Sequence, residues 1–439
     1  MNADFFAPKT ALGRPHAVWV ACGALVLGGS ALAQTQVVKP PVAQYWMDVA
    51  TVSMAGMDDM PSMGALGALI PGMPGAGGPS FGATRGMVPG RWLDLAVVTQ
   101  RKPEGTEATQ SIPAGQNMGA SLVLVPVQAQ TKTPSGQQRG SAEEVPERPK
   151  GRILFYWGCG ETVRPGQPRV LDFSTTPTED YGKFMMGRAV RDTGAKAEPG
   201  HSIWPNEKHR QSVPATASLV GQHAITGEGL PATLKFALES QQDFMPRLGL
   251  NSSGGGAAPT GLTWQALPSA HAYFLNAMGS VDNKGQNDMV IWSSSEVPEP
   301  GWGLMDYASN ASVDQWLKEK VLLPATRTQC TIPAGVFAKA QGSMLRGIAY
   351  GHELNLAYPP RPNDKKVAWE PEWAAKVRVK SVAMAMLGED ASSTTASSGS
   401  GTGTSPAPKE NGTAQEKSKI PAIPGLPDVG KALKGLFGR

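Results

Sequence analysis

Methionine supplies the most distinctive chemical pattern in the sequence. Met54, Met57, Met60 and Met63 recur at every third residue. Thioether sulfur is a soft ligand, so an array of this kind can bind Cu(I) or Ag(I) where thiolates are scarce. Methionine side chains also adapt to irregular apolar surfaces. Two interpretations therefore stay open: a soft-metal site, or an apolar arm that docks on a sheet or on a partner.

Tryptophans beside turn residues form the second set of candidates. Trp302 lies next to Gly303, and Trp369 and Trp373 flank Pro371. Exposed apolar side chains often mark a binding site, so loop tryptophans can line a surface that binds sugar or peptide. The same residues could instead close the edge of a β-sandwich. We take Trp302, Trp369 and Trp373 as candidate binding-surface residues.

The familiar catalytic motifs are absent from the sequence. It contains no G-x-S-x-G elbow, no H-E-x-x-H, no phosphate-binding P-loop and no C-x-x-C. Acidic residues such as Glu296 and Glu299 lie in a proline-rich stretch, and sequence alone does not show whether two carboxylates face one cleft. No catalytic or cofactor-binding residue is therefore predicted.

The first 33 residues have the pattern of a secretory signal peptide. Lys9 and Arg14 are basic, residues 17–32 are apolar or small, and an Ala-Leu-Ala cleavage sequence ends at Ala33. The apolar stretch is shorter than the ~20 residues that a membrane-spanning helix needs, which favours cleavage over anchoring. We expect an exported chain that lies in the periplasm, at the outer membrane or outside the cell.

Two cysteines remain after such a cleavage, Cys159 and Cys330. In an oxidising compartment they can form one disulfide. A bridge requires Cα atoms within about 7 Å, which a sequence does not reveal. The alternative is two buried, unpaired thiols.

The composition limits both the fold and the partners. The 439 residues include 52 glycines and 38 prolines, a density that breaks helices and argues against a helical bundle. The formal net charge is +4, and the basic residues are scattered along the chain. Nucleic acid is therefore not an expected partner.

Short segments of alternating apolar residues predict a mainly β chain. Leu234, Phe236 and Leu238 alternate with polar residues, which is typical of a half-buried strand. Further strands are expected at 45–49, 91–100, 122–127, 153–157, 170–173, 262–266, 272–278, 289–292 and 345–350. Along 377–386 the apolar residues change parity near Ser381, which predicts a β-bulge or two strands. We expect one or two antiparallel β-sandwich domains with one short helix and long disordered arms.

The short helix is expected from Ser312 to Val321. Ser312 begins a capping-box pattern, and Val313 and Trp316 recur at helical spacing. Pro324 follows and prevents the helix from continuing.

Composition shifts divide the chain into eight segments. They are a signal peptide (1–33), an N-terminal strand segment (34–52), a Met/Gly/Pro-rich flexible arm (53–90), a first β-rich region (91–190), an irregular connection (191–224), a second, sandwich-like β-rich domain (225–390), a disordered Ser/Thr/Gly/Pro linker (391–424) and a short basic amphipathic segment (425–439). An apolar stripe runs from Val429 to Phe437. This last segment can contact a membrane surface or a partner groove, or dock back on its own domain.

The segment from Leu262 to Tyr273 resembles the second and third strands of fibronectin type III-like and immunoglobulin-like sandwiches. Trp264 in one strand, Pro268 in the turn and Tyr273 in the next strand have a spacing similar to that of the family. The resemblance covers about a dozen residues, implies a β-sandwich and is silent on function. As a whole, the chain resembles exported bacterial proteins without an assigned function.

These features favour an exported, non-enzymatic β-sandwich protein that binds or scaffolds an envelope protein or a cell-surface component. A secreted hydrolase that acts on polysaccharide or peptide is the alternative, supported by the export pattern, the β content and the loop tryptophans. The methionine array supports a third interpretation, which is binding of Cu(I) or Ag(I).

Overall fold

Strands make up 42% of the structure and helices 8%, so the prediction of a mainly β chain is confirmed. The computed structural model describes residues 36–55, 79–128 and 150–387. Within these ranges there are two α-helices, where the sequence predicted one. Neither of the helices in the described part of the chain has the length and hydropathy to cross a bilayer.

The elements follow one another along the chain with short strands between longer ones. The strands are β1 (Ala43–Met54), β2 (Gly90–Thr99), β3 (Ala108–Ser111), β4 (Ser121–Pro126), β5 (Arg152–Trp157), β6 (Arg169–Asp172), β7 (Ser202–Trp204), β8 (Gly221–Gly227), β9 (Lys235–Leu238), β10 (Leu250–Gly254), β11 (Thr260–Trp264), β12 (Ala270–Asn283), β13 (Gln286–Ser293), β14 (Leu323–Pro324), β15 (Gln329–Ile332), β16 (Gln341–Gly351), β17 (Leu354–Tyr358) and β18 (Trp373–Leu387). The helices are α2 (Thr178–Met185) and α3 (Asn310–Lys318), and the 3-10 turns are η1 (Ala83–Arg85), η2 (Ala114–Gln116) and η3 (Ser240–Gln242).

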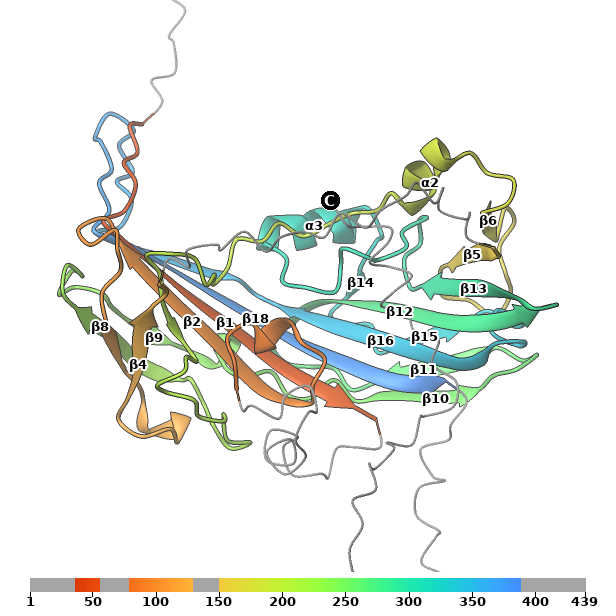
Figure 1. Cartoon of the computed structure of the whole chain (residues 1–439), viewed down its shortest axis with the longest axis horizontal. Helices are drawn as coiled ribbons and strands as arrows, with labels where there is room; N and C mark the ends of the chain where they lie inside the picture. The colour runs from red at the N-terminus through yellow and green to blue at the C-terminus, as the bar shows by residue number, and fades with distance from the viewer. Residues whose placement is uncertain (1–35, 56–78, 129–149, 388–439) are drawn as a thin grey trace, which may run out of the picture.

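One large sheet holds fifteen strands, in the order β6-β5-β13-β12-β16-β18-β1-β2-β7-β4-β3-β8-β9, with β14 beside β12 and β17 beside β18. Strands from both β-rich regions belong to it, since β5 pairs with β13. β1 pairs in parallel with β18, from Ala43 opposite Trp373 to Met54 opposite Met384, and antiparallel with β2. The first and last described strands therefore lie side by side at the sheet centre (Figure 1).

β18 is one unbroken strand, so the predicted break near Ser381 is wrong. Val377 and Val379 enter the main core on one face, and Val382 packs into a second cluster on the other face. Because both faces of the central sheet are buried, apolar residues occupy both parities of β18 without a bulge.

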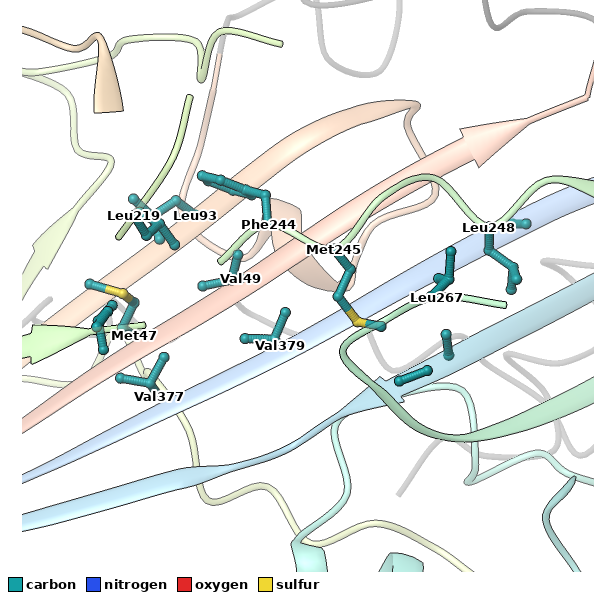
Figure 2. Packing of buried hydrophobic residues seen from close by; sticks show 14 of the residues in the cluster. Met47, Val49, Leu93, Leu219, Phe244, Met245, Leu248, Leu267, Val377 and Val379 are labelled. Carbon is teal, nitrogen blue, oxygen red and sulfur yellow. The ribbon is translucent and has the colours of Figure 1, made fainter. Parts of the chain in front are cut away.

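The main hydrophobic core lies on one face of the large sheet, where later segments cross over the central strands. Figure 2 shows Met47 of β1, Val377 of β18 and Met245 from a crossing segment within this cluster. On the same face, the rings of Tyr45 and Phe236 have centroids 5.5 Å apart. Removal of this apolar surface from water is the main force that stabilises the fold.

A small sheet of three strands, β10-β11-β15, covers another part of this face. Trp264 of β11 packs edge-on against Tyr273 of β12, with ring centroids 5.6 Å apart. Leu250 and Ile332 from the small sheet belong to the main core. Two sheets that share one core in this way form a sandwich layer.

A disulfide joins the small sheet to the large one. Cys159 follows β5, Cys330 lies in β15, and their Cα atoms are 5.2 Å apart. The predicted pair is therefore present and the alternative of two free thiols is not. The bond closes a loop across 171 residues, which restricts the unfolded chain strongly.

Helix α3 covers part of the opposite face. The Ser309 side chain accepts a hydrogen bond from the Ser312 backbone N–H, so the cap lies three residues before the expected one. Val313 and Trp316 are buried in the second hydrophobic cluster. The predicted helix is thus confirmed with a shifted start. Helix α2 was missed, although Tyr181, Phe184 and Met185 recur at helical spacing and pack against a third cluster.

Several predicted features lie outside the described residues. They are the signal peptide (1–33), Met57, Met60, Met63, the linker (391–424) and the C-terminal segment (425–439). Met54, in contrast, is the last residue of β1. Part of the predicted arm is also described and includes η1.

Candidate functional site

The candidate site is built on a β-ribbon that projects from one end of the large sheet, at the upper left of Figure 1. We call residues 36–42 and 354–376 the ribbon. In it, β17 runs antiparallel to the start of β18. The N-terminal stretch joins through Trp369, whose N–H donates to the Val37 carbonyl and whose carbonyl accepts from Lys39, both at 2.9 Å.

The register of three strands forms the floor of a groove. Across β1, β18 and β17 the first row is Gln44, Ala374 and Ala357, and the second row is Trp46, Lys376 and Asn355. Directly opposed residues of paired strands point to the same face, so these six side chains share one surface. The groove above them has a volume of about 670 Å³.

Proline and tryptophan side chains form the walls of the groove. Pro41, Pro360 and Trp369 all line it. The Trp369 indole N–H donates to the Pro359 carbonyl at 3.0 Å, and the Arg361 guanidinium lies 5.5 Å from the centre of its ring. Rigid proline rings and a tryptophan held on two sides make a preorganised wall, which loses little entropy when a ligand binds.

Four apolar side chains of the ribbon are exposed, and one of them, Val38, lines the groove. Val37 is 63% exposed, Val38 and Val367 are each 49% exposed, and Tyr358 is 43% exposed. Several exposed apolar residues on one element mark an interaction site more often than a single exposed residue does. The ribbon is therefore the strongest candidate for a binding surface in the described part of the chain.

The charged residues of the groove lining are all basic. Lys39, Arg361 and Lys376 line the groove, and the lining contains no carboxylate, histidine, cysteine or serine. On the rim, Lys39 pairs with Glu370 at 2.7 Å, and Lys376 pairs with Glu353 at 3.2 Å. The lining itself is therefore positively charged, and the two carboxylates lie on its rim.

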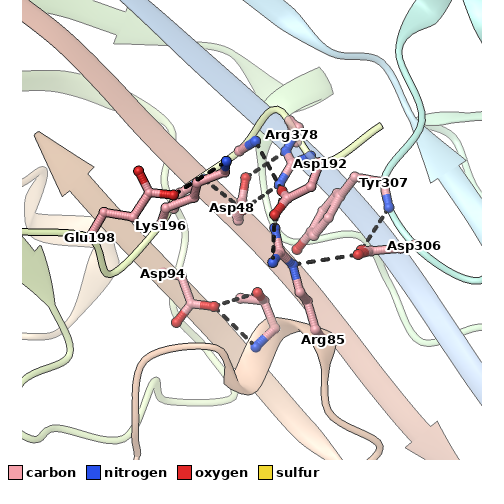
Figure 3. Close-up of polar contacts among 12 residues, drawn as sticks. Asp48, Arg85, Asp94, Asp192, Lys196, Glu198, Asp306, Tyr307 and Arg378 are labelled. Carbon is pink, nitrogen blue, oxygen red and sulfur yellow. Dashed lines mark hydrogen bonds and ion pairs between the residues drawn. The ribbon is translucent and has the colours of Figure 1, made fainter. Parts of the chain in front are cut away.

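A buried ion pair lies beyond the inner end of this floor (Figure 3). Arg378, the next residue after Lys376 on the same face of β18, donates to Asp48 at 2.7 and 2.5 Å. Their side chains are 3% and 2% exposed. A segment that we call the strap, residues 188–200, crosses this pair, and the Ala195 N–H donates to Asp48 at 3.1 Å.

The strap approaches β18 closely at Gly194. A Cβ atom at this position would lie 1.5 Å from Arg378 and 2.5 Å from Asp48, so only glycine fits. A second ion pair holds the strap from the other side, because Arg85 contacts Asp192 at 2.5 Å. The ion pairs therefore fix the position of the strap.

Burial sets the pKa values in this network. It lowers the pKa of Lys380, and the contact with Asp306 at 2.7 Å opposes that effect only in part. Burial also raises the pKa of Asp94 to about 6, against the hydrogen bonds that Thr84 and Gly82 donate to its carboxylate. Asp94 thus holds the turn η1 and Lys380 holds Asp306, whereas the strap is held by Asp48 and by the pair of Arg85 and Asp192.

The three predicted tryptophans do not share one surface. Trp369 lies in the groove wall. Trp373 is 5% exposed, faces the main core and stacks on Tyr358 at 6.1 Å, so its place is the core rather than a binding surface. Trp302 packs in a third cluster with Phe155. Trp46 also lines the groove and was not among the predicted residues, because the pairing of β1 decides which face of the sheet it occupies.

Methionines do gather on one face of the sheet, at the far end of β1 and β18. They are Met54, Met278, Met289, Met344, Met384 and Met386, which are direct or diagonal cross-strand neighbours. In residues 36–55, 79–128 and 150–387, no group of three or more His, Cys, Asp or Glu side chains is arranged to hold a metal ion. The soft-metal prediction for Met57, Met60 and Met63 stays a prediction.

The comparisons with known proteins do not assign the chain to a family. Comparison with protein-family models, with curated proteins and with solved structures found no significant match. The likeness around Trp264 and Tyr273 therefore remains a local one, and a function must be argued from the groove itself.

Proposed function

We propose that the protein is an exported, non-enzymatic β-sandwich protein of the cell envelope, and that its groove binds an extended, proline-containing segment of an envelope protein or cell-surface component. One observation carries this proposal. A groove of about 670 Å³, walled by prolines and Trp369, lies on a ribbon that exposes four large apolar side chains.

A segment in the polyproline II conformation suits the chemistry of the lining. Such a helix has no internal hydrogen bonds, so its carbonyls can accept from groups on the floor. Gln44, Asn355 and Lys376 supply donors there. Its rings pack well against aromatic side chains, and Trp46 and Trp369 supply those. The absence of carboxylates from the lining supports binding over hydrolysis of a sugar.

Fluorescence anisotropy on the full chain tests the proposal. The probe is a labelled synthetic peptide of three Ala-Leu-Pro repeats, and the control peptide has three Ala-Leu-Gly repeats. We expect the probe to bind at least ten-fold more tightly than the control. Trp369→Ala should weaken probe binding by roughly thirty-fold, because a central aromatic anchor contributes about 2 kcal/mol or more. Trp369→Phe keeps a ring and should weaken binding only a few-fold.

Met186→Ala is the matched control variant. Met186 follows α2 and is 70% exposed, and α2 lies at the other end of the sheet from the ribbon (Figure 1). Its removal should leave probe binding unchanged. If both peptides bind equally, or if Trp369→Ala binds the probe as the wild type does, the groove does not have the proposed function.

The proposal of export rests on the first 33 residues and has its own test. The chain from a periplasmic or secreted fraction should begin at Gln34, two residues before Gln36, which donates to the Val367 carbonyl on the ribbon at 2.8 Å. A chain that retains residue 1 in the cytoplasmic fraction would contradict export.

Soft-metal binding is a second candidate, because six methionines share one face. Met54 lies directly opposite Met384, and Met386 directly opposite Met344. Calorimetric titration of the full chain with Ag(I) should show saturable binding. Combined Met54→Leu and Met384→Leu should weaken that binding at least ten-fold, whereas Met186→Leu should not. Equal binding by all three proteins would remove this candidate.

A further inference from the structure

We infer that the groove is occupied in the free protein by the chain's own C-terminal segment from Ile420 to Pro427, bound as a polyproline II helix. The inference rests on the proposed function of the groove. It identifies the segment that fills the groove until a partner displaces it, so the segment and the partner would compete for one site.

The sequence of this segment has a strict period of three. Its prolines are Pro421, Pro424 and Pro427, and each follows an apolar residue, namely Ile420, Ile423 and Leu426. A polyproline II helix has three residues per turn, so the prolines form one row along it and the apolar side chains form the adjacent row. Two adjacent apolar rows match a groove with Ala357 and Ala374 on its floor and Trp369 in its wall.

Charged residues flank the segment on both sides. Asp428 follows the last proline and is complementary to Arg361 and Lys376 in the lining. Lys419 precedes the first apolar residue and is complementary to Glu370 on the rim. The segment between these ends carries no charge, as an apolar groove requires.

The length of chain beyond β18 allows the segment to reach the groove of its own molecule. From Ala374 in the groove to Leu387 at the end of β18, the strand covers roughly 43 Å. Residues 388–419 connect Leu387 to the segment, and a Gly/Ser/Thr-rich chain of that length has a root-mean-square extent of roughly 30 Å and a maximum of about 110 Å. A span of this size gives an effective concentration on the order of millimolar within one molecule.

A peptide-binding measurement on the full chain tests the inference. The probe is a labelled peptide with the sequence of residues 418–428. It is titrated into the wild type and into a tail variant that carries Pro421→Ser, Pro424→Ser and Pro427→Ser. We expect the tail variant to bind the probe at least ten-fold more tightly, because its groove is vacated. The thermal midpoints of the two proteins should agree, since the substitutions lie outside the described fold.

Two further variants separate the groove from the rest of the surface. Trp369→Ala added to the tail variant should abolish the ten-fold gain. Met186→Ala added to the tail variant should leave the gain intact. A gain that survives Trp369→Ala would show that the segment binds elsewhere, and that result would overturn the inference.

Other outcomes distinguish this inference from the proposed function. Equal binding of the probe by the wild type and the tail variant would overturn occupation within one molecule. Self-association of the wild type in sedimentation, lost in the tail variant, would assign the segment to a second copy and also overturn it. If neither protein binds the 418–428 peptide but both bind the Ala-Leu-Pro probe, only the inference fails. If neither peptide binds, the proposed function fails as well.

Discussion

Breaking the buried ion pair between Asp48 and Arg378 should destabilise the protein by several kcal/mol. Both side chains are 2–3% exposed, and two hydrogen bonds join them. Burial alone would lower the pKa of Arg378, but the hydrogen bonds and the charge of Asp48 outweigh burial and raise it. Asp48→Asn leaves the guanidinium buried without its countercharge, and Arg378→Met leaves the carboxylate with the Ala195 N–H.

The loss of one partner from a buried pair typically costs about 3–5 kcal/mol. We expect each single variant to lie in this range, because almost none of either side chain reaches water. The double variant Asp48→Asn with Arg378→Met removes both charges. Its cost should therefore be smaller than the sum of the two single costs by at least about 2 kcal/mol.

Urea unfolding at pH 7, followed by tryptophan fluorescence with the disulfide intact, measures these free energies. The control is the exposed pair of Lys39 and Glu370, whose side chains are each 58% exposed. Lys39→Met and Glu370→Gln should each change the free energy of unfolding by no more than about 0.5 kcal/mol. Single Asp48 or Arg378 variants that cost less than about 1 kcal/mol, or strictly additive costs, would refute the reasoning.

Three more predictions concern stability. Burial raises the pKa of Asp94 from 3.8 to about 6, so the stability that its bound proton contributes is complete below about pH 4 and is lost as the pH rises through about 6. Relative to Asp94→Asn, the wild type should lose up to roughly 3 kcal/mol between pH 4 and pH 7 in urea unfolding, and a constant difference would contradict this. Combined Cys159→Ala and Cys330→Ala should lower the free energy of unfolding by roughly 5 kcal/mol, the chain-entropy value for a loop of 171 residues, and a loss below about 1 kcal/mol would contradict that model. Ser309→Ala should cost about 1 kcal/mol by calorimetry because it removes the cap of α3, whereas Ser309→Asp should cost much less.

Local patterns in the sequence located many of the elements. The alternation of Leu234, Phe236 and Leu238 corresponds to β9, and the short apolar run at 153–157 corresponds to β5. The spacing of Val313 and Trp316 located α3. Each of these patterns lies within a few residues of the element that it predicts. It can therefore be recognised without knowledge of the tertiary structure.

Pairing between distant strands left no such signal. Asp48 and Arg378 are 330 residues apart in the sequence, yet β1 and β18 are neighbours along twelve consecutive pairs. Layers pack on both faces of β18, so Val377 lies in the main core and Val382 in the second cluster on the opposite face. A pattern of this kind cannot be separated from a bulge until the partner strands are known.

The groove forms because alternate residues of β1 point to opposite faces of the sheet. A single buried contact on the other face helps to fix which of these residues face the groove. Tyr45 and Trp46 are adjacent aromatic residues, and nothing in the sequence states which one enters the core. In the structure the Tyr45 hydroxyl donates to the Gln110 side chain at 2.6 Å within the core. Successive residues of a strand point to opposite faces, so this contact directs Trp46 outward to the groove floor beside Lys376. A shift of one residue in the register would exchange the two rings and remove the floor, so the groove depends on a polar contact that no ligand touches.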